Sequence, residues 1–397
     1  MGAPTSAAKA ISPFQKLNDR LAGIAPGAAP VNLGLGEPQH PIPSFVGPVI
    51  AANLDLFGRY PAIRGTDAFR STVAAWLDRR YGLAASPIDP ETMVLPLNGS
   101  REGLFFAALG ARERFGARER ATGIERPVVL LPNPFYQAYA AGAEAAGLEI
   151  VLLDAGPETR FMPDLGLVAP EILARTVALY VASPTNPQGG VARLADWTAL
   201  IQAARRHDFM IFADECYSEI YRSVPPPGVL EAAAAIGAGF ANILTFHSLS
   251  KRSNLPGLRA GFVAGDPAFI AAWTRLRNMA APQVPGPIQA VAVAAYGDEA
   301  HVAENRALYN AKFALAREML GAEEPEGGFF LWLNVGDGEE AAVRLWREAG
   351  VRTIPGAYLC LPSAGGDNPG RPYLRVAMVQ DIETTTEALR RMARVLG

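Results

Sequence analysis

The chain has 397 residues, and its 36 lysines and arginines against 39 aspartates and glutamates give a formal net charge of −3 at pH 7. Half of the residues are hydrophobic and 19% are charged. This composition is typical of a globular protein, and the length corresponds to roughly two or three domains. The near-neutral charge balance disfavours a strongly basic nucleic-acid-binding protein, so we expect no nucleic-acid partner.

Cysteine and histidine content argues against two further kinds of site. The two cysteines, Cys216 and Cys360, are too few for a disulfide framework, and the four histidines are too scattered for a zinc site. We therefore expect no metal and a reducing compartment, the cytoplasm. The first residues do not resemble a signal peptide. Two weakly charged stretches, 232–250 and 279–297, contain polar residues or prolines, and we expect them to be buried rather than to span a membrane.

Short apolar runs alternate with longer helical patterns through the first two thirds of the chain. Helices are predicted at 68–80, 101–115, 137–146 and 196–207, and strands at 128–131, 150–153, 177–182, 210–213, 243–246 and 261–264. Alternation of this kind predicts a mostly parallel sheet covered by helices.

The pattern changes after about residue 287. Helices are predicted at 301–320, 339–349 and 382–396, and a strand at 328–335. This order is typical of an α+β domain. We therefore predict a large α/β domain over 44–287 and a smaller domain over 288–397, which the N-terminal arm, 1–43, partly joins.

Unusual polar residues follow several of the predicted strands. Tyr136 follows the strand at 128–131, Asn186 the strand at 177–182, Asp214 and Tyr217 the strand at 210–213, and Lys251 the strand at 243–246. Ligands of open parallel sheets bind outside the carboxyl ends of the strands. Lys251 is one of only four lysines in the chain, and it is the only one that we place at the end of a strand.

This set of side chains suits pyridoxal phosphate. A lysine amine forms a Schiff base with that cofactor, a buried carboxylate keeps its ring nitrogen protonated, and oriented donors hold its phosphate. Each residue taken alone has an ordinary structural explanation, since aspartate often caps helices and aromatic residues often only pack. The prediction depends on their order and spacing together.

With these residues in this order, the chain resembles the class I/II aminotransferases, which are fold type I pyridoxal-phosphate enzymes, over about residues 32–379. The resemblance implies a large domain with a mostly parallel seven-stranded sheet and a smaller α+β domain. It also implies that Lys251 forms the Schiff base, that Asp214 pairs with the pyridine nitrogen, and that Tyr217 and Asn186 contact the ring hydroxyl. Gln188 stands where the family more often has threonine, which leaves the asparagine in place.

The resemblance assigns further residues to the phosphate. Ser248 and Arg259 would bind it, and Gly99, Ser100 and Arg101 open a predicted helix whose unpaired N–H groups form an anion site. Tyr60 matches the tyrosine that reaches the phosphate of a neighbouring subunit. The resemblance therefore implies a homodimer with sites at the interface.

Three more residues would face the ring or the substrate. Tyr136 matches the aromatic residue that stacks on the ring, and Gly36 matches the glycine that lets the substrate approach the main chain. Arg375 matches the arginine that binds the substrate α-carboxylate. A guanidinium suits that role because its planar fork binds a carboxylate through two hydrogen bonds.

Three short segments are similar to N-succinyldiaminopimelate aminotransferases of lysine biosynthesis: residues 36–43, 248–259 and 368–370. This similarity implies ping-pong transfer of an amino group between glutamate and N-succinyl-2-amino-6-oxopimelate. That acceptor needs a second anion site apart from Arg375, and the candidates are Arg64, Arg101 and Arg252.

Several alternatives remain open or disfavoured. An aminotransferase for another amino acid, such as aspartate, or a pyridoxal-phosphate C–S lyase would share nearly all of these residues. A non-enzymatic regulator is disfavoured because no helix-turn-helix segment precedes the fold. A nucleotide-binding dehydrogenase is disfavoured because Gly34 and Gly36 lack the third glycine of the dinucleotide fingerprint.

Overall fold

The computed structural model describes residues 12–123, 125–237, 239–280, 283–363 and 365–397. Its central feature is a seven-stranded sheet in the order β2-β8-β7-β6-β5-β3-β4. β8 runs antiparallel to both of its neighbours, β2 and β7, and the other strand pairs of this sheet are parallel. The strands are β2 (Val94–Leu97), β3 (Val128–Asn133), β4 (Glu149–Asp154), β5 (Thr176–Ala182), β6 (Met210–Asp214), β7 (Ile243–Ser248) and β8 (Gly261–Gly265).

The predicted α/β class and the mostly parallel sheet are confirmed, and all six placed strands lie within observed strands. The seventh strand, β2, has no counterpart among the strands predicted from the sequence. It is four residues long, contains Pro96, and pairs only with β8 at the edge of the sheet. Proline lacks the N–H that a sheet ladder needs, and an edge strand tolerates it because one of its sides has no neighbouring strand. A proline within a short apolar run argues against a strand, so the sequence pattern did not predict β2.

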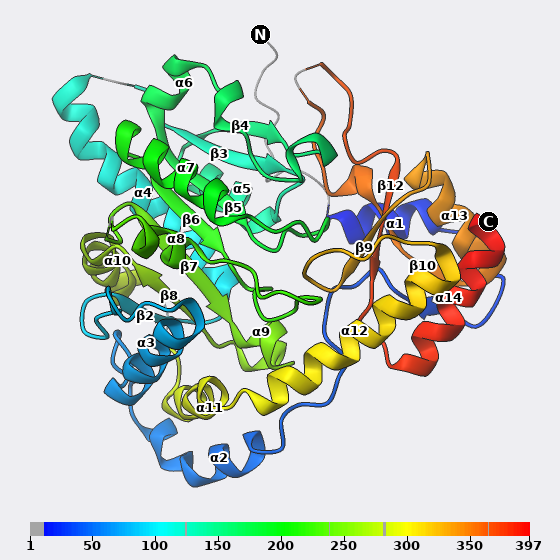
Figure 1. Cartoon of the computed structure of the whole chain (residues 1–397), viewed down its shortest axis with the longest axis horizontal. Coiled ribbons are helices and arrows are strands. Elements are labelled where there is room, and N and C mark those ends of the chain that lie inside the picture. The colour runs from blue at the N-terminus through cyan, green and yellow to red at the C-terminus, as the bar shows by residue number, and fades with distance from the viewer. Residues whose placement is uncertain (1–11, 124, 238, 281–282, 364) are drawn as a thin grey trace.

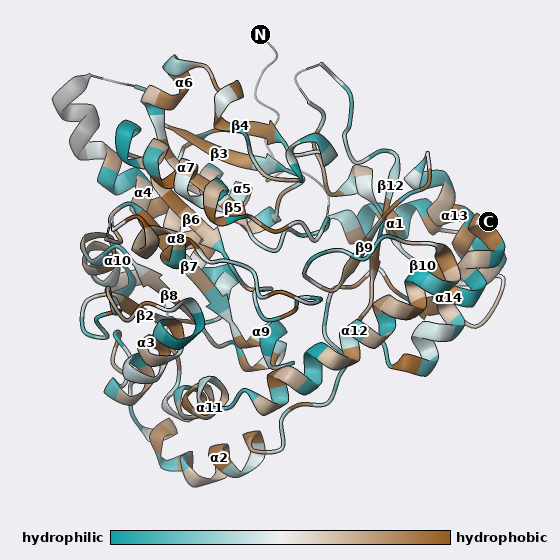
Figure 2. Cartoon of the chain, viewed as in Figure 1, coloured by the Kyte–Doolittle hydropathy of each residue, from teal (hydrophilic) through white to brown (hydrophobic). Residues whose placement is uncertain are grey.

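Helices cover both faces of the large sheet (Figure 1). Alternate side chains of each strand therefore enter two different cores: in β6, Ile211 and Ala213 pack on one face and Met210 and Phe212 on the other. Figure 2 shows the resulting hydrophobic colour along β3. One face is covered by α3 (Asp67–Tyr81), α7 (Leu194–His207), α8 (Val229–Ala235) and α11 (Gly286–Gly297), and the other by α4 (Ser100–Thr122), α5 (Gln137–Ala145) and α10 (Pro267–Ala280).

Two small sheets form the rest of the fold. One is three-stranded, in the order β11-β12-β9, and the other pairs β1 with β10. Their strands are β1 (Val31–Asn32), β9 (Phe330–Asn334), β10 (Val351–Arg352), β11 (Ile354–Pro355) and β12 (Tyr373–Ala377). The parallel pairing of β1 with β10 joins a segment near the N-terminus to the C-terminal part.

The remaining helices lie around these sheets. They are α1 (Pro13–Leu21), α2 (Val46–Ala52), α6 (Pro170–Arg175), α9 (Leu249–Arg252), α12 (Ala300–Leu320), α13 (Gly338–Ala349) and α14 (Ile382–Leu396). The three helices predicted after residue 300 match α12, α13 and α14 to within one residue. In Figure 1, α12 runs from beside α11 to the small sheet, so it joins the two parts of the fold.

The domain limits remain a proposal, with one change. The predicted boundary at 287/288 falls inside α11, and α11 packs against α2 and α3 of the large part. A helix that buries its face in one core moves with that core. We therefore propose that the large domain extends to the end of α11.

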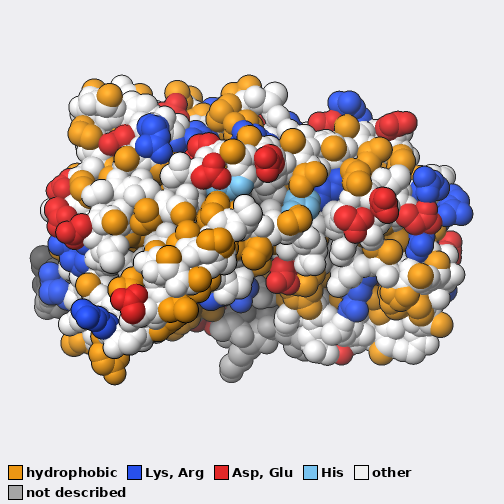
Figure 3. Space-filling model, turned by 90° about the horizontal axis from the view of Figure 1, so that it is seen from below, with side chains coloured by type: hydrophobic (Ala, Val, Ile, Leu, Met, Phe, Trp, Pro, Cys, Tyr) orange, Lys and Arg blue, Asp and Glu red, His pale blue; other side chains and the backbone are white. Residues whose placement is uncertain are grey.

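Two surface features agree with the composition. Within the described ranges, no helix is long and apolar enough to cross a membrane. Figure 3 shows acidic and basic side chains interspersed on the face seen from below, as a net charge near zero leads one to expect.

Gly142 provides a test of how tightly the helices pack on the sheet. A Cβ added to Gly142 of α5 would lie 2.5 Å from the main-chain oxygen of Phe105 in α4, and main chain cannot yield cheaply. We expect Gly142→Ala to lower the free energy of unfolding by about 2 kcal/mol in urea titrations. Gly47→Ala in α2 is the control, because its Cβ would meet no atom within 4 Å and alanine favours helix. Equal effects of the two substitutions would contradict this packing.

Candidate active site

A pocket of about 240 Å³ opens at the carboxyl ends of the parallel strands, between the large sheet and the small one. Nine of the residues singled out from the sequence line it: Gly36, Ser100, Arg101, Tyr136, Asn186, Asp214, Tyr217, Lys251 and Arg375. They come from segments more than 300 residues apart in the chain. The topology therefore brings into one pocket side chains for which the sequence showed only their order along the chain.

Lys251 lies in α9, a single turn that directly follows β7. The side chain of Ser248 caps this turn by accepting a hydrogen bond from the Ser250 N–H at 3.2 Å. The Lys251 amine donates to the main-chain oxygen of Gly36 at 2.7 Å and lies 5.1 Å from the centre of the Phe329 ring. Burial, together with the positive charge of Arg375, lowers the pKa of this amine to about 8. The amine is thus easier to deprotonate than an ordinary lysine.

Asp214 ends β6 and is buried. Its carboxylate accepts a hydrogen bond from the Tyr139 hydroxyl at 2.6 Å and another from the Cys216 N–H at 3.3 Å. Burial raises the pKa of Asp214, while these hydrogen bonds lower it. A cationic group placed in the pocket would favour the charged carboxylate.

Arg375, on β12, is the buried cation of the opposite wall, with 6% of its surface exposed. Its guanidinium donates to the main-chain oxygen of Gly34 at 2.7 Å and to the Asn186 side chain at 3.5 Å. Its Nε atom has no hydrogen-bond partner, and among the described residues no carboxylate lies within 4 Å of it. Burial lowers the pKa of Arg375 to about 10, which is still high enough for a cation at pH 7. A carboxylate ligand would supply the missing partner.

A group of main-chain and side-chain donors lies at the start of α4. Gly99 precedes the helix with φ +79°, and a Cβ there would overlap the Arg259 guanidinium. Arg259 is itself exposed and donates to the main-chain oxygen of Asn98 at 3.1 Å. Gly99, Ser248 and Arg259 do not line the pocket directly, but Gly99 and Arg259 lie beside Ser100, which does. Helix N–H groups and a guanidinium in one place form an anion site.

Tyr136 and Arg101 form another side of the pocket. The Arg101 Nε–H donates to the Tyr136 hydroxyl, so the orientation of each side chain is fixed by the other. Gly36 faces Phe330, because a Cβ on Gly36 would lie 2.6 Å from that ring. The close packing of this ring therefore favours glycine at this position.

Three of the predicted residues lie elsewhere. Tyr60 is 99% exposed and does not line the pocket of its own chain. Arg64 pairs loosely with Glu91 at 3.8 Å and is also outside the pocket. Neither side chain therefore contributes to the pocket of its own chain.

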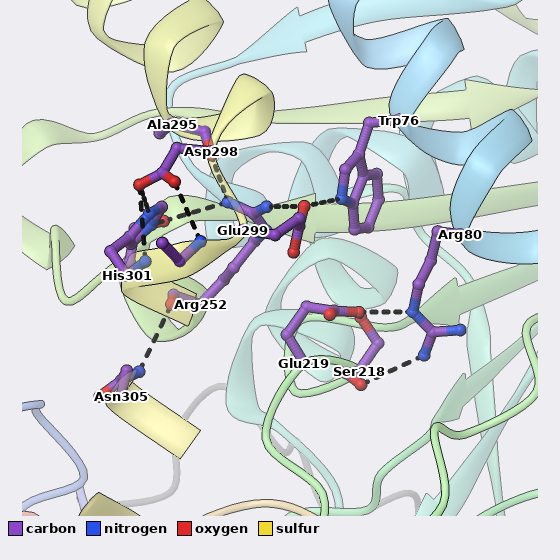
Figure 4. Close-up of polar contacts among 12 residues, drawn as sticks. Trp76, Arg80, Ser218, Glu219, Arg252, Ala295, Asp298, Glu299, His301 and Asn305 are labelled. Atoms are coloured by element: carbon purple, nitrogen blue, oxygen red, sulfur yellow. Dashed lines mark hydrogen bonds and ion pairs between the residues drawn. The ribbon is translucent and has the colours of Figure 1, made fainter. Parts of the chain in front are cut away.

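Arg252 is the third, and its predicted role as a substrate anion site is wrong. Its guanidinium is buried and donates to the Ala295 main-chain oxygen at 2.6 Å and to Glu299 at 2.5 Å. Figure 4 shows Glu299 also bound to the Trp76 indole. Neighbours in sequence point to opposite sides of this short turn, so Arg252 joins α9 to α11 while Lys251 enters the pocket.

Sequence reasoning missed several residues of the pocket. Tyr139 lies one helical turn after Tyr136, and that spacing was its only signal. An apolar wall was also missed, because its members come from unrelated segments: Pro13, Phe14, Leu35, Phe135, Phe161, Phe330 and Leu359. Phe14 belongs to α1, so the N-terminal helix contributes to the site.

Comparison with known proteins agrees with this geometry. The sequence pattern of the family "Aminotransferase class I and II" matches residues 29–392. The chain belongs to this family.

Similar proteins cover nearly the whole of this aminotransferase. The crystal structure of an aminotransferase from Neisseria meningitidis is 35% identical, with a TM-score of 0.90, and covers 97% of each chain. The 4-dedimethylamino-4-oxo-anhydrotetracycline transaminase OxyQ of Streptomyces rimosus is 33% identical over 91% of this chain and 92% of its own. An LL-diaminopimelate aminotransferase of Dehalococcoides mccartyi is 28% identical over 93% and 92%. The likenesses confirm the predicted family and fold.

The family uses pyridoxal phosphate, and the donors of this pocket fit that group. The anion site at the start of α4 suits the phosphate, and the small Gly99 leaves room for Arg259 beside it. Buried Asp214 suits the protonated ring nitrogen, and the Lys251 amine suits the cofactor aldehyde. Asn186, Tyr217 and Tyr136 would contact the ring itself.

The lowered pKa of Lys251 gives the first test of this site. We expect the cofactor-free protein to capture pyridoxal phosphate faster as the pH rises through about 8, because the neutral amine attacks and is lost as the pH falls below that value. Stopped-flow absorbance between pH 6.5 and 10 measures the rate. Lys251→Ala is the control and should show no capture. A midpoint near the ordinary lysine pKa of about 10.4 would contradict the effect of burial.

Proposed function

We propose that this aminotransferase moves the amino group of glutamate to an oxo acid in two half-reactions at one site. The observation that carries this proposal is Arg375, a buried guanidinium with a free Nε donor that faces the same pocket as Lys251. It would bind the α-carboxylate that glutamate and the oxo acid share. Because both substrates use the same arginine in turn, we expect ping-pong kinetics.

Lys251 is proposed as the general base. Its free amine would take the proton from the substrate Cα and would hold that proton for the return step at the same site. The hydrogen bond to the Gly36 oxygen holds the amine near the pocket wall and limits its rotation. Burial, which lowers its pKa to about 8, suits a base that works near neutral pH.

Pyridoxal phosphate, when bound, accepts the electron pair that the substrate Cα–H bond leaves behind. Asp214 is proposed to keep the ring nitrogen protonated. Tyr139 holds one oxygen of this carboxylate at 2.6 Å and the Cys216 N–H orients the other, so the carboxylate is fixed before the cofactor arrives. Tyr217 and Asn186 are proposed to contact the ring hydroxyl.

For the acceptor we propose N-succinyl-2-amino-6-oxopimelate, a long oxo acid of lysine biosynthesis. Apart from Lys251 and Arg375, Arg101 is the cation among the described residues that lines the pocket, and it would bind the distal carboxylate. The methylene groups of this substrate would lie along Leu35 and Phe161. The relative from Dehalococcoides mccartyi, by its name, acts on the related diaminopimelate.

A second candidate is an oxo acid or oxo compound with a bulky apolar group. The apolar wall around Phe14 favours it, and the name of the Streptomyces rimosus relative describes a polycyclic substrate. An aminotransferase for another amino acid, such as aspartate, and a C–S lyase are further alternatives, and the experiments below distinguish them.

Absorbance of the bound cofactor tests the reaction. Glutamate added without any oxo acid should convert the bound pyridoxal phosphate to pyridoxamine phosphate and release 2-oxoglutarate. The succinylated oxo-pimelate should restore the original spectrum, and shorter oxo acids should not. Restoration only by aromatic oxo acids would favour the second candidate. A spectrum that ignores glutamate would refute glutamate as the donor, and release of pyruvate from a cysteine conjugate would indicate a C–S lyase.

Arg375 and Arg101 should respond differently to substitution. Arg375→Ala should reduce kcat/KM for glutamate and for the acceptor by about a hundredfold, because both lose a charge-assisted pair of hydrogen bonds. Arg101→Ala should raise KM for the succinylated acceptor about tenfold more than for glutamate. Equal effects of Arg101→Ala on both substrates would remove this residue as the distal anion site.

We further propose that the active unit is a homodimer in the cytoplasm. Tyr60 is fully exposed beside the exposed Leu54 and Phe57, and it can serve a phosphate only in a second subunit. Both cysteines are buried and unpaired, which suits a reducing compartment. Light scattering should give twice the chain mass, and Tyr60→Phe should weaken cofactor affinity without dissociating the dimer. A fully active monomer would refute this assembly.

A further inference from the structure

A chain of hydrogen bonds outside the pocket reaches the main chain of Lys251. It begins at the buried amine of Lys312, which contacts His40 Nε2 at 2.7 Å and donates to the Gln380 main-chain oxygen at 2.7 Å. His40 Nδ1 lies 2.7 Å from the Asn305 side-chain oxygen. The Asn305 amide then donates to the oxygens of Lys251 and Arg252 at 3.3 and 3.4 Å.

Each link has one direction when Lys312 is charged. An ammonium group can only donate, so His40 Nε2 accepts and the imidazole proton lies on Nδ1. Nδ1–H then donates to the Asn305 oxygen, which leaves the Asn305 amide to donate to α9. The imidazole also packs on the Tyr309 ring, with 4.5 Å between ring centres. Both ring nitrogens of His40 and both polar atoms of the Asn305 side chain are therefore hydrogen-bonded.

These hydrogen bonds connect α9, which carries Lys251, with the segment that carries Gly36. His40 follows Gly36 by four residues, and Gly36 supplies the oxygen that the Lys251 amine contacts. Asn305 and Lys312 lie on α12, which spans the two parts of the fold in Figure 1. Figure 4 shows Asn305 reaching the main chain at Arg252 from this helix. The position of the amine relative to the Gly36 oxygen thus depends on contacts on the far side of α9.

Burial of the Lys312 amine costs free energy. This cost indicates that the hydrogen bonds from Lys312 through His40 and Asn305 to α9 have a functional role. It is 1% exposed, and among the described residues no carboxylate lies within 4 Å of its amine. Burial lowers its pKa to about 7, and the charge of Asp381 partly offsets this. Burial also lowers the pKa of His40. An apolar side chain would fill this space with no such cost.

We propose that His40, Asn305 and Lys312 are positioning residues that fix α9, and with it the Lys251 amine, relative to the Gly36 oxygen. This inference rests on the proposed role of Lys251 as the reactive amine. None of the three residues lines the pocket, so they act through the main chain and not on the substrate. Loss of the chain should therefore slow the proton-transfer step and leave substrate binding nearly unchanged.

Two asparagines of α12 provide a matched comparison. Asn305→Leu removes the contacts to α9, and Asn310→Leu removes a similar amide contact to the main-chain oxygen of Arg222, away from Lys251. In the loaded enzyme, we expect Asn305→Leu to slow the glutamate half-reaction about tenfold with KM changed less than about twofold. Asn310→Leu should leave both values near those of the wild type. An equal loss in the two variants, or a loss confined to KM, would overturn the proposal.

A second readout needs no activity. The full chain without cofactor is treated with a trace of acetic anhydride, and mass spectrometry compares acetylation of Lys251 with that of Lys16. The four lysines fall in separable peptides. We expect Asn305→Leu to raise the Lys251 to Lys16 ratio about fivefold, because the freed amine leaves the Gly36 oxygen more often, and Asn310→Leu to leave it unchanged. An unchanged ratio in Asn305→Leu would overturn the proposal even if no transamination were found.

His40→Phe serves if Asn305→Leu fails to fold. It keeps a ring against Tyr309 and removes both hydrogen bonds, so it should change labelling and rate in the same direction. His40→Asn can still donate from the Nδ1 position to Asn305 and should restore most of the wild-type ratio. Failure of His40→Asn to differ from His40→Phe would show that His40 only fills space.

Discussion

The site depends on the burial of three ionisable groups around one pocket. Burial disfavours the charged form of each group. It raises the pKa of Asp214 and lowers the pKa values of Lys251 and Arg375. Ligands of complementary charge, a carboxylate for Arg375 and a cationic ring nitrogen for Asp214, reverse two of these costs. The lowered pKa of Lys251 needs no ligand to offset it, because a neutral amine available near pH 8 suits a base.

The packing that buries these groups comes from both parts of the fold. Asp214 ends β6, Lys251 lies in the turn that follows the neighbouring parallel strand β7, and Arg375 comes from a small antiparallel sheet. The segment around Gly36 contacts three different elements. The Gly34 oxygen accepts a hydrogen bond from Arg375, the Gly36 oxygen accepts one from the Lys251 amine, and His40 contacts Lys312 of α12. This one segment therefore contacts groups from both parts of the fold.

The same layout separates residues that are adjacent in the sequence. Lys251 enters the pocket, whereas the next residue, Arg252, is held by Ala295 and Glu299 below the site. The prediction that Arg252 binds substrate came from its closeness in sequence alone. Arg101 has the same sequence closeness and does line the pocket, so closeness along the chain could not decide between the two.

The sequence by itself determined the positions of six strands along the chain, the long helices and the polar residues that follow the strands. Periodicity and residue type are local properties, and the resemblance to a family lies in short motifs. The edge strand with Pro96, the apolar wall with Phe14, the link from Tyr139 to Asp214 and the chain from Lys312 to Lys251 were decided only by the tertiary structure. Each of these joins segments far apart in the chain or depends on which way a side chain points, and neither is a property of local pattern.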